Sequence, residues 1–185
     1  MKLHVESDGA RVASIPVQGG RMPSIAADGT VNLGITLPLQ ARSHWCWAAI
    51  GSTLTEYFGA PPLTQAQVAE RMTGTDGEGS NKNLELNRVL ERVGCHGHWS
   101  PGRPTFDRLA YEINRGHPLA VRIEWLRGDA HYVLVTGYNA ARHDLEIADS
   151  LHGASRQAYD DFPRGYHNGG GLWTETFWTN YMGET

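Results

Sequence analysis

The sequence predicts a single domain of the α+β class, with helices in the first half and antiparallel strands in the second. Apolar residues recur at helical spacing between residues 45 and 116, and a period of two replaces that spacing from residue 117 onward. Glycines and prolines separate the periodic segments. A chain of 185 residues is long enough for one well-buried core and short for two full domains.

The first 36 residues carry a weaker pattern, rich in Gly, Pro, Ser and Asp, with brief apolar alternation around Val31 and Leu33. We expect residues 1–36 to form an extended N-terminal arm or propeptide-like segment that contains one or two short strands. Residues 37–185 are then the folded domain.

The first helix is predicted over residues 45–58, because apolar side chains recur there at positions 47, 50, 54 and 58. Ser43 is expected to cap its N-terminus, and Gly59 to end it. Later helices are expected to have Thr64, either Asn81 or Asn83, and Thr105 as N-caps, and Gly116 ends the last of them. These helices are predicted within residues 63–72, 84–94 and 104–116.

The strands follow, and the second and third are joined as a hairpin by residues 139–144. They are predicted within residues 117–125, 129–139, 144–150, 155–162 and 169–181. The stretch GCHGHW at residues 94–99 is predicted to be a loop that follows a helix.

Charge and hydropathy exclude several classes of protein. The net charge is −4 and the isoelectric point is about 6.1, which argues against electrostatic binding of nucleic acid. No apolar run approaches the length that spans a membrane, and the N-terminus lacks the apolar core of a Sec signal peptide. We therefore expect neither a nucleic-acid partner nor a membrane partner.

The chain contains two cysteines, Cys46 and Cys95, which are too few for a disulfide-stabilised scaffold of this length. We expect both to be free thiols. Cys46 lies between two tryptophans at the first turn of the predicted helix, where the helix dipole favours the thiolate. By itself a free cysteine is more often a buried core residue than a nucleophile.

Two further residues favour the interpretation of Cys46 as a nucleophile. His131 opens a predicted strand and is a candidate base, and Asp149 ends the next strand, where its carboxylate is expected to orient the imidazole. The alternative interpretation of Asp149 is an ordinary turn residue. Asp144 is the other candidate for the residue that orients His131, but it lies in a hairpin turn, where aspartate is common for local reasons.

Gln40 precedes Cys46 by six residues. Its side-chain amide is expected to join the backbone N–H of Cys46 in stabilising an oxyanion. Loss of one such donor typically costs about 2.7–4 kcal/mol of transition-state stabilisation.

The Gln40 to Cys46-Trp47 spacing resembles that of the papain-like cysteine peptidases. The strand HYVLVTGYN at 131–139 is similar to that family's catalytic-histidine strand, and IADS at 147–150 resembles the site of its third residue, which is Asn in papain and Asp in many bacterial relatives. The WCWAA motif and GLWTETFW at 171–178 are most similar to a bacterial branch that includes phytopathogen effector proteases and the peptidase domains of bacteriocin transporters.

The resemblance covers about residues 38–180 and implies a papain-like fold, in which a helical half carrying the catalytic cysteine packs against a C-terminal antiparallel sheet. It implies hydrolysis of protein or peptide substrates through a thioester, without a cofactor. It also implies a bacterial effector or toxin, with a cognate immunity or inhibitor protein as a further partner. We expect the protein in the bacterial cytoplasm, or exported by a non-Sec system into a target cell.

Two tryptophans are candidates for binding substrate. Trp45 is adjacent to the cysteine and Trp173 lies in a late strand, although core packing is the common fate of either. Paired glycines, Gly19 and Gly20, resemble the sequence after which bacteriocin-processing peptidases cut, but are also ordinary turn residues.

No metal site is expected. Cys95, His96 and His98 lack the second Cys/His cluster that structural zinc requires. The glycine-rich stretches at 73–80 and 168–171 lack the lysine of a phosphate-binding loop.

Two rival functions use the same residues. Transglutaminases and deamidases form the same acyl-enzyme with a Cys-His-Asp triad, and a non-catalytic module would keep the fold for binding alone.

Overall fold

The computed structural model describes residues 20–74 and 81–182. It confirms the predicted α+β class, with an antiparallel sheet of eight strands; most of the sheet follows the helices in the chain, but β1 and β2 precede α1, and β3 lies between α3 and α4. The helices are α1 (Cys46–Tyr57), α2 (Gln65–Thr73), α3 (Leu86–Arg92), α4 (Phe106–Asn114) and the short 3-10 helix η1 (Tyr166–Asn168). The strands are β1 (Ser24–Ile25), β2 (Val31–Asn32), β3 (His96–Pro101), β4 (Leu119–Trp125), β5 (Ala130–Asn139), β6 (Asp144–Asp149), β7 (Gly153–Ala158) and β8 (Gly171–Thr179).

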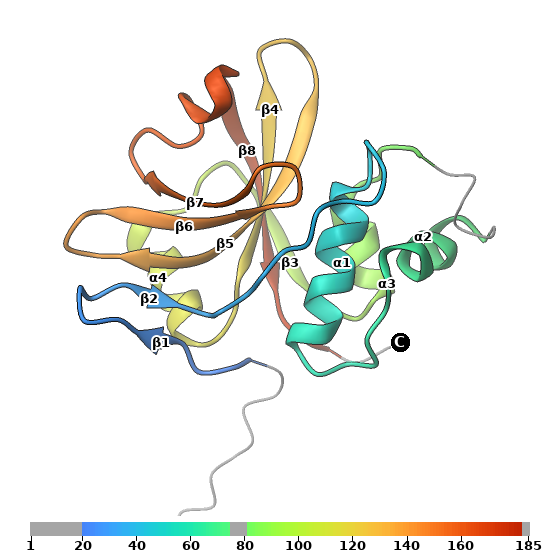
Figure 1. Cartoon of the computed structure of the whole chain (residues 1–185), viewed down its shortest axis with the longest axis horizontal. Helices are drawn as coiled ribbons and strands as arrows, with labels where there is room; N and C mark the ends of the chain where they lie inside the picture. The colour runs from blue at the N-terminus through green and yellow to red at the C-terminus, as the bar shows by residue number, and fades with distance from the viewer. Residues whose placement is uncertain (1–19, 75–80, 183–185) are drawn as a thin grey trace, which may run out of the picture.

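The strand β5 is the centre of the sheet. It pairs with β4 through residues 130–135, with β2 through residues 137–138 and with β6 through residues 134–139. Beyond β4 lie β8 and then β3, and beyond β6 lies β7 (Figure 1). Both edges of β5 are hydrogen-bonded to neighbouring strands, and almost all of its side chains are buried, so a polar side chain on it is held rigidly.

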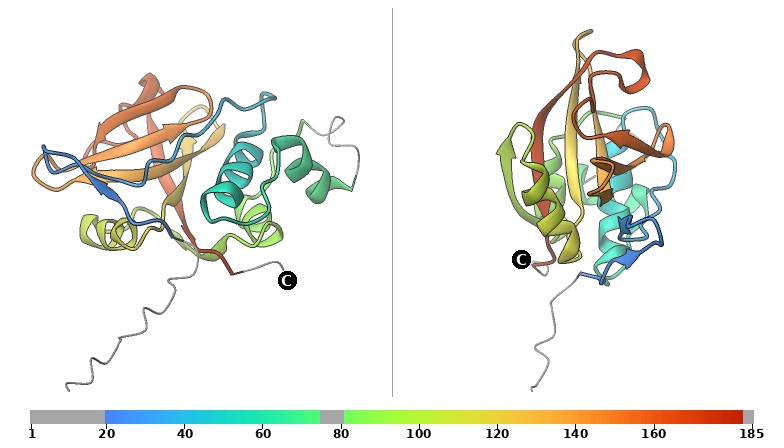
Figure 2. Two further views of the ribbon diagram at one scale, coloured as in Figure 1. Left: turned by 60° about the horizontal axis from the view of Figure 1, so that its bottom comes forward. Right: turned by 90° about the vertical axis from the view of Figure 1, so that its left-hand side faces the viewer.

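Helices α1, α2 and α3 contact one another and form a group beside the sheet, whereas α4 packs separately against β2, β4 and β5. Figure 2 shows the two groups from two further directions. The N-terminus of α1 contacts the sheet at β5, so the start of this helix and the start of β5 face each other. No described helix is long and apolar enough to cross a bilayer.

Residues 20–36, which the sequence assigns to an arm, are part of this packed structure. Val31 and Leu33 are buried in the core, and β2 extends the sheet beside Tyr138. The packed chain therefore begins well before residue 37, and residues 1–19 of the predicted arm lie outside the described residues.

The prediction of a loop at residues 94–99 was wrong, because His96–Pro101 form β3 and pair with β8. This strand lies at the edge of the sheet, and most of its side chains are exposed or only partly buried. It therefore lacks the apolar alternation by which a strand is found in a sequence.

Two of the predicted helix caps are confirmed. The Thr64 side chain accepts a hydrogen bond from Gln67 N–H, and the Gln67 side chain returns one to the Thr64 backbone, which completes a capping box. Thr105 caps α4 by accepting from Arg108 N–H.

The other two caps were predicted wrongly. α1 and α3 begin at Trp45 and Glu85 without a side-chain cap, and the Ser43 hydroxyl instead accepts from the Asn81 amide at 2.8 Å. The Asn81 oxygen in turn accepts from the backbone N–H of His44 at 3.0 Å. These polar residues therefore fix the loop that precedes Cys46.

The buried face of α1 anchors the helical half. Trp47, Ile50 and Leu54 are inaccessible to solvent, and the Trp47 indole N–H donates to the Lys82 carbonyl at 2.9 Å. Gly51 faces α2 and α3 so closely that a methyl group there would press on Val68 and Val89 at 3.1–3.2 Å.

We predict that Trp47→Ala lowers the free energy of unfolding by about 3–5 kcal/mol, because it opens a cavity and leaves the Lys82 carbonyl without its donor. Urea denaturation followed by circular dichroism measures this change. Leu39→Ala, at a side chain that is 70% exposed, is the control and is expected to change stability by less than about 0.5 kcal/mol. Equal effects of the two substitutions would contradict this account of α1.

Candidate active site

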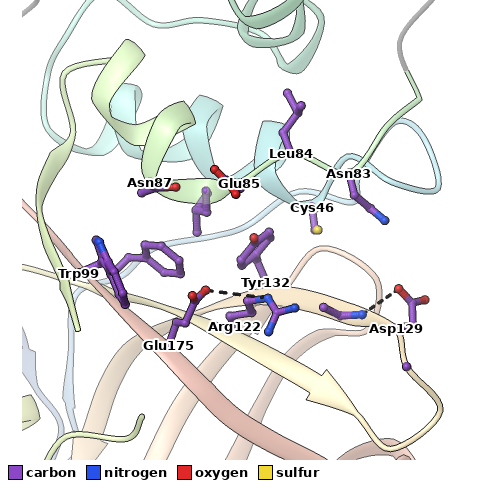
Figure 3. A pocket seen from close by; sticks show the side chains of 14 residues that line it. Cys46, Asn83, Leu84, Glu85, Asn87, Trp99, Arg122, Asp129, Tyr132 and Glu175 are labelled. Atoms are coloured by element: carbon purple, nitrogen blue, oxygen red, sulfur yellow. Dashed lines mark hydrogen bonds and ion pairs between the residues drawn. The ribbon is translucent and has the colours of Figure 1, made fainter. Parts of the chain in front are cut away.

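Cys46 is the first residue of α1 and lies where two cavities meet. The larger cavity has a volume of about 630 Å³ and the smaller about 370 Å³, and both are lined by Cys46, Asn83, Asp129 and Ala130. Figure 3 shows the Cys46 sulfur pointing from α1 toward the sheet. The first intrahelical hydrogen bond runs from Ala49 N–H to the Trp45 carbonyl, so the amides at Cys46 precede the hydrogen-bonded ladder. The positive end of the helix is therefore directed at the thiol.

Strands β5 and β6 bring His131 and Asp149 together, although 18 residues separate them in sequence. His131 lies near the start of β5 and Asp149 is the last residue of β6. His131 Nε2 and Asp149 Oδ1 are 2.7 Å apart. Because Nε2 is occupied by the carboxylate, Nδ1 is the ring nitrogen left to interact with the Cys46 side chain, which lines the smaller cavity together with His131. The structure thus brings the three predicted catalytic side chains together.

The Asp149 carboxylate has no exposed surface and is surrounded by donors. Its Oδ1 also accepts from Leu151 N–H at 2.7 Å, and its Oδ2 accepts from the Tyr166 hydroxyl at 2.8 Å. Burial alone raises the pKa of a carboxyl group, but the hydrogen bonds and charge of His131, Leu151 and Tyr166 outweigh it and lower the pKa of Asp149 to about 2. Asp149 is therefore ionised throughout the neutral range.

The pKa of His131 is shifted in the opposite direction, upward. Burial favours the neutral imidazole, but the hydrogen bonds and charges of Asp149 and Cys46 outweigh it and raise the pKa of His131 to about 9. His131 is therefore an imidazolium at neutral pH. A cation beside Cys46 and at a helix N-terminus favours the thiolate, which is the nucleophilic form of cysteine.

The side chain of Gln40, the predicted oxyanion donor, is hydrogen-bonded to three other groups of the protein. Its amide nitrogen donates to the carbonyls of Arg42 at 2.9 Å and Ser43 at 2.7 Å, and its amide oxygen accepts from the Ser150 hydroxyl at 2.9 Å. The Gln40 backbone N–H also donates to the Ser150 carbonyl. Gln40 therefore ties the loop before Cys46 to the turn after Asp149.

The predicted substrate-binding tryptophans belong to the core. Among the described residues, the linings of the two cavities at Cys46 include neither Trp45 nor Trp173. Trp45 is 2% exposed and its ring lies under the Arg42 guanidinium. The Trp173 indole N–H donates to the Thr176 hydroxyl at 2.8 Å, so both rings face away from the cleft.

A different tryptophan lines the smaller cavity. Trp125 stacks on Tyr166, with ring centroids 6.4 Å apart, and a side chain at Gly169 would overlap the Trp125 ring. The glycines at 169–171 therefore serve close packing over Tyr166, the donor to Asp149. No sequence pattern indicated Tyr166, because it lies in an irregular segment 17 residues beyond its partner.

The larger cavity is lined mainly by polar and aromatic side chains (Figure 3). Arg122 lies on its floor with Glu124 at 2.6 Å and Glu175 at 3.9 Å, and Trp99 is half-exposed at its side. These residues could not be grouped from the sequence, because they come from β3, β4 and β8, which are far apart in the chain.

Cys95, the second thiol, is fully buried, and both cysteines are free, as predicted. Burial raises the pKa of Cys95 to about 12, so this thiol is unreactive at neutral pH.

A thiol at the start of a helix, facing a hydrogen-bonded imidazole and carboxylate on an antiparallel sheet, is the arrangement of a papain-like cysteine peptidase. The family described as papain-like cysteine protease AvrRpt2 matches residues 28–167, which is most of the chain. The protein therefore belongs to that family and is a papain-like cysteine protease.

A comparison with solved structures agrees on the fold. A double glycine motif protease from an AMS/PCAT transporter, solved in complex with the leader peptide, superposes with a TM-score of 0.52 at 15% sequence identity. The match covers 86% of this chain and 100% of the other. No curated protein matches this sequence significantly.

The raised pKa of His131 predicts an alkaline limb in the pH profile. Activity that needs the imidazolium is complete well below pH 9 and is lost as the pH rises through about 9. In Asp149→Asn the carboxylate charge is absent, so the limb is expected to move toward 6.5, the ordinary pKa of histidine. The pH dependence of kcat/KM for a peptide substrate measures this shift.

Asp144→Asn is the matched control, because Asp144 lies at the other end of β6 and pairs with Arg142 at 2.8 Å. Its alkaline limb is expected to stay near that of the wild type. A limb that does not move in Asp149→Asn would contradict the electrostatic role of Asp149.

Proposed function

We propose that the protein is an endopeptidase in which Cys46, His131 and Asp149 act as nucleophile, acid–base and orienting residue. The observation that carries this proposal is the 2.7 Å hydrogen bond between His131 and Asp149 in the cavity that His131 and Cys46 line together. The Cys46 thiolate attacks the carbonyl carbon of the scissile bond and forms a C–S bond. The His131 imidazolium gives its Nδ1 proton to the leaving amine as the C–N bond breaks, which leaves a thioester. Neutral His131 then takes a proton from water, and the resulting hydroxide displaces Cys46 to release the acid.

The oxyanion of each tetrahedral intermediate is placed at the N-terminus of α1, where the Cys46 backbone N–H is available as a donor. Gln40 reaches it only after releasing one of its two carbonyl partners. The Ser43 carbonyl is the partner on the exposed side of the loop, so this bond is the one that substrate binding would exchange.

We propose a Gly-Gly sequence at the cut site. Cys46 lies at the junction of the two cavities, which share Cys46, Asn83, Asp129 and Ala130 as lining residues. Glycines carry no side chain that would have to be accommodated at this junction. The preference also agrees with the double glycine motif named for the structural neighbour.

The chain has a Gly-Gly of its own at residues 19 and 20, of which Gly19 lies outside the described residues. Gly20 packs against the Arg115 and Gly116 carbonyls, and the Tyr57 hydroxyl donates to the Gly116 carbonyl at 2.9 Å. Tyr57 ends α1, about 16 Å from Cys46 along a helix that rises 1.5 Å per residue. Cutting of this sequence therefore requires a second molecule or release of the segment.

We further propose that the biological role is that of a bacterial effector protease acting on proteins of a target cell. The resemblance of the cysteine and histidine motifs to effector proteases supports this role. A cognate immunity or inhibitor protein would then be a partner that occludes the cleft.

Selective alkylation tests whether Cys46 is a nucleophile. We predict that iodoacetamide or an epoxide of the E-64 type modifies the native protein once, at Cys46, because Cys95 is buried and protonated. Peptide mapping by mass spectrometry identifies the site. Cys95→Ala is the control and should be labelled at the wild-type rate, and both thiols should react in denaturant. Absence of labelling at Cys46 would indicate a non-catalytic module.

Peptide cleavage tests the proposed specificity. A peptide copying residues 13–24 is expected to be cut at Gly19-Gly20 by the wild type and not by Cys46→Ala. Replacing both glycines of the peptide by alanine is expected to lower kcat/KM at least about tenfold, or about 1.4 kcal/mol. Equal cutting of both peptides would contradict the Gly-Gly preference. On treated proteins, a mass gain of about 1 Da or a cross-link without cleavage would instead favour the deamidase or transglutaminase alternative.

A further inference from the structure

Two histidines outside the proposed triad lie beside its carboxylate. His152 is in the turn between β6 and β7, His167 is in η1, and both are exposed and line the smaller cavity with Cys46. Their imidazole rings are stacked, with centroids 3.6 Å apart and planes inclined by 26°. The proposed hydrolysis uses neither ring, so their close approach to the site is unexplained by it.

The two rings and the Asp149 carboxylate are close enough to share a metal ion. One ligand atom from each of Asp149, His152 and His167 lies within 4.8 Å of the other two. In a tetrahedral zinc site with bonds of about 2.0–2.1 Å, neighbouring ligand atoms are about 3.3 Å apart. To point one nitrogen each at such an ion, the two exposed rings would have to turn out of their stack, whereas the carboxylate is held in place by its donors.

The surroundings of the three residues also suit a metal. The Tyr166 hydroxyl donates to Asp149 Oδ2 at 2.8 Å, which is the type of outer hydrogen bond that orients a ligating carboxylate. The His167 backbone has φ 48° and ψ 32°, a left-handed conformation that is sparse for residues other than glycine, and its ring stacks on that of His152.

We propose that Asp149, His152 and His167 form a site for a divalent transition metal, with Zn²⁺ as the ion that fits, and that the bound ion inhibits the peptidase. Two imidazoles and one carboxylate are the donor set of open zinc sites, in which water completes the coordination. A dication on Asp149 competes with His131 for the carboxylate. His131 then loses the hydrogen-bond partner that orients its ring in the cavity beside Cys46.

The metal site itself does not depend on the proposed function, whereas its inhibitory effect rests on the roles proposed for His131 and Asp149. Binding is therefore tested without catalysis, in Cys46→Ala, which also removes the competing thiol ligand. This variant is titrated with Co²⁺, a spectroscopic substitute for Zn²⁺. We expect one equivalent to bind, with the visible absorption of a tetrahedral ion.

Adding His152→Ala or His167→Ala to Cys46→Ala is expected to weaken Co²⁺ binding at least about tenfold. Adding His44→Ala is the matched control, because His44 lines the same cavity but is outside the three-residue group, and binding should be retained. Absence of Co²⁺ binding to Cys46→Ala, or equal binding after loss of His152 and of His167, would overturn the metal site.

The inhibitory effect is tested by the rate at which iodoacetamide alkylates Cys46 in proteins that retain this thiol. We expect Zn²⁺ to slow alkylation of the wild type and of His44→Ala, and to have at least about tenfold less potency on His152→Ala and His167→Ala. Equal slowing of all four proteins would place the inhibitory ion on Cys46 and His131 themselves and would overturn the inhibitory role. Neither metal test depends on cleavage of the Gly-Gly peptide, so failure to cut that peptide would not change their outcome.

Discussion

The hydrogen bond between His131 Nε2 and Asp149 Oδ1 is the interaction on which the organisation of the site depends. A carboxylate without exposed surface is costly unless several donors compensate it, and Asp149 receives donors from His131, Leu151 and Tyr166. The same bond directs Nδ1 of the ring toward Cys46 and holds the proton on the imidazole. The pairing of β5 with β6 is therefore also a chemical constraint, because it brings the strand that carries His131 beside the strand that carries Asp149.

The position of the thiol depends on a second set of polar contacts, outside the triad. α1 starts without a side-chain cap, so its first turn is not fixed by a local motif. Instead, Asn81 holds Ser43 and His44, and Gln40 holds the same loop against Ser150, the residue after Asp149. The helical half and the sheet are thereby joined on both sides of the cleft. Ser43, Asn81 and Gln40 thus position the loop that precedes Cys46.

Much of the fold and of the site could be predicted from local motifs and from apolar alternation in the sequence. The features that could not be predicted depend on contacts between residues far apart in the chain. The capping box at Thr64 and the central strand β5 depend on neighbouring residues, so both could be identified in the sequence. The approach of His131 to Asp149 followed from the pairing of consecutive strands. By contrast, β3 is an edge strand without alternation, and Tyr166 reaches Asp149 from an irregular segment. Trp45 and Trp173, the two candidates for binding substrate, are both buried in the core.

The aromatic layer over Asp149 connects packing with chemistry. Trp125 stacks on Tyr166, and Gly169 leaves room for that stack, so the hydroxyl of Tyr166 is held against Oδ2 while water is kept from the carboxylate. Burial strengthens every electrostatic contact of Asp149, including the one that keeps His131 protonated. At its outer edge this layer ends in the exposed pair His152 and His167. The feature that makes Asp149 an effective partner for His131, a concentrated negative charge in a dry environment, is therefore the same feature that attracts a cation from the solvent side.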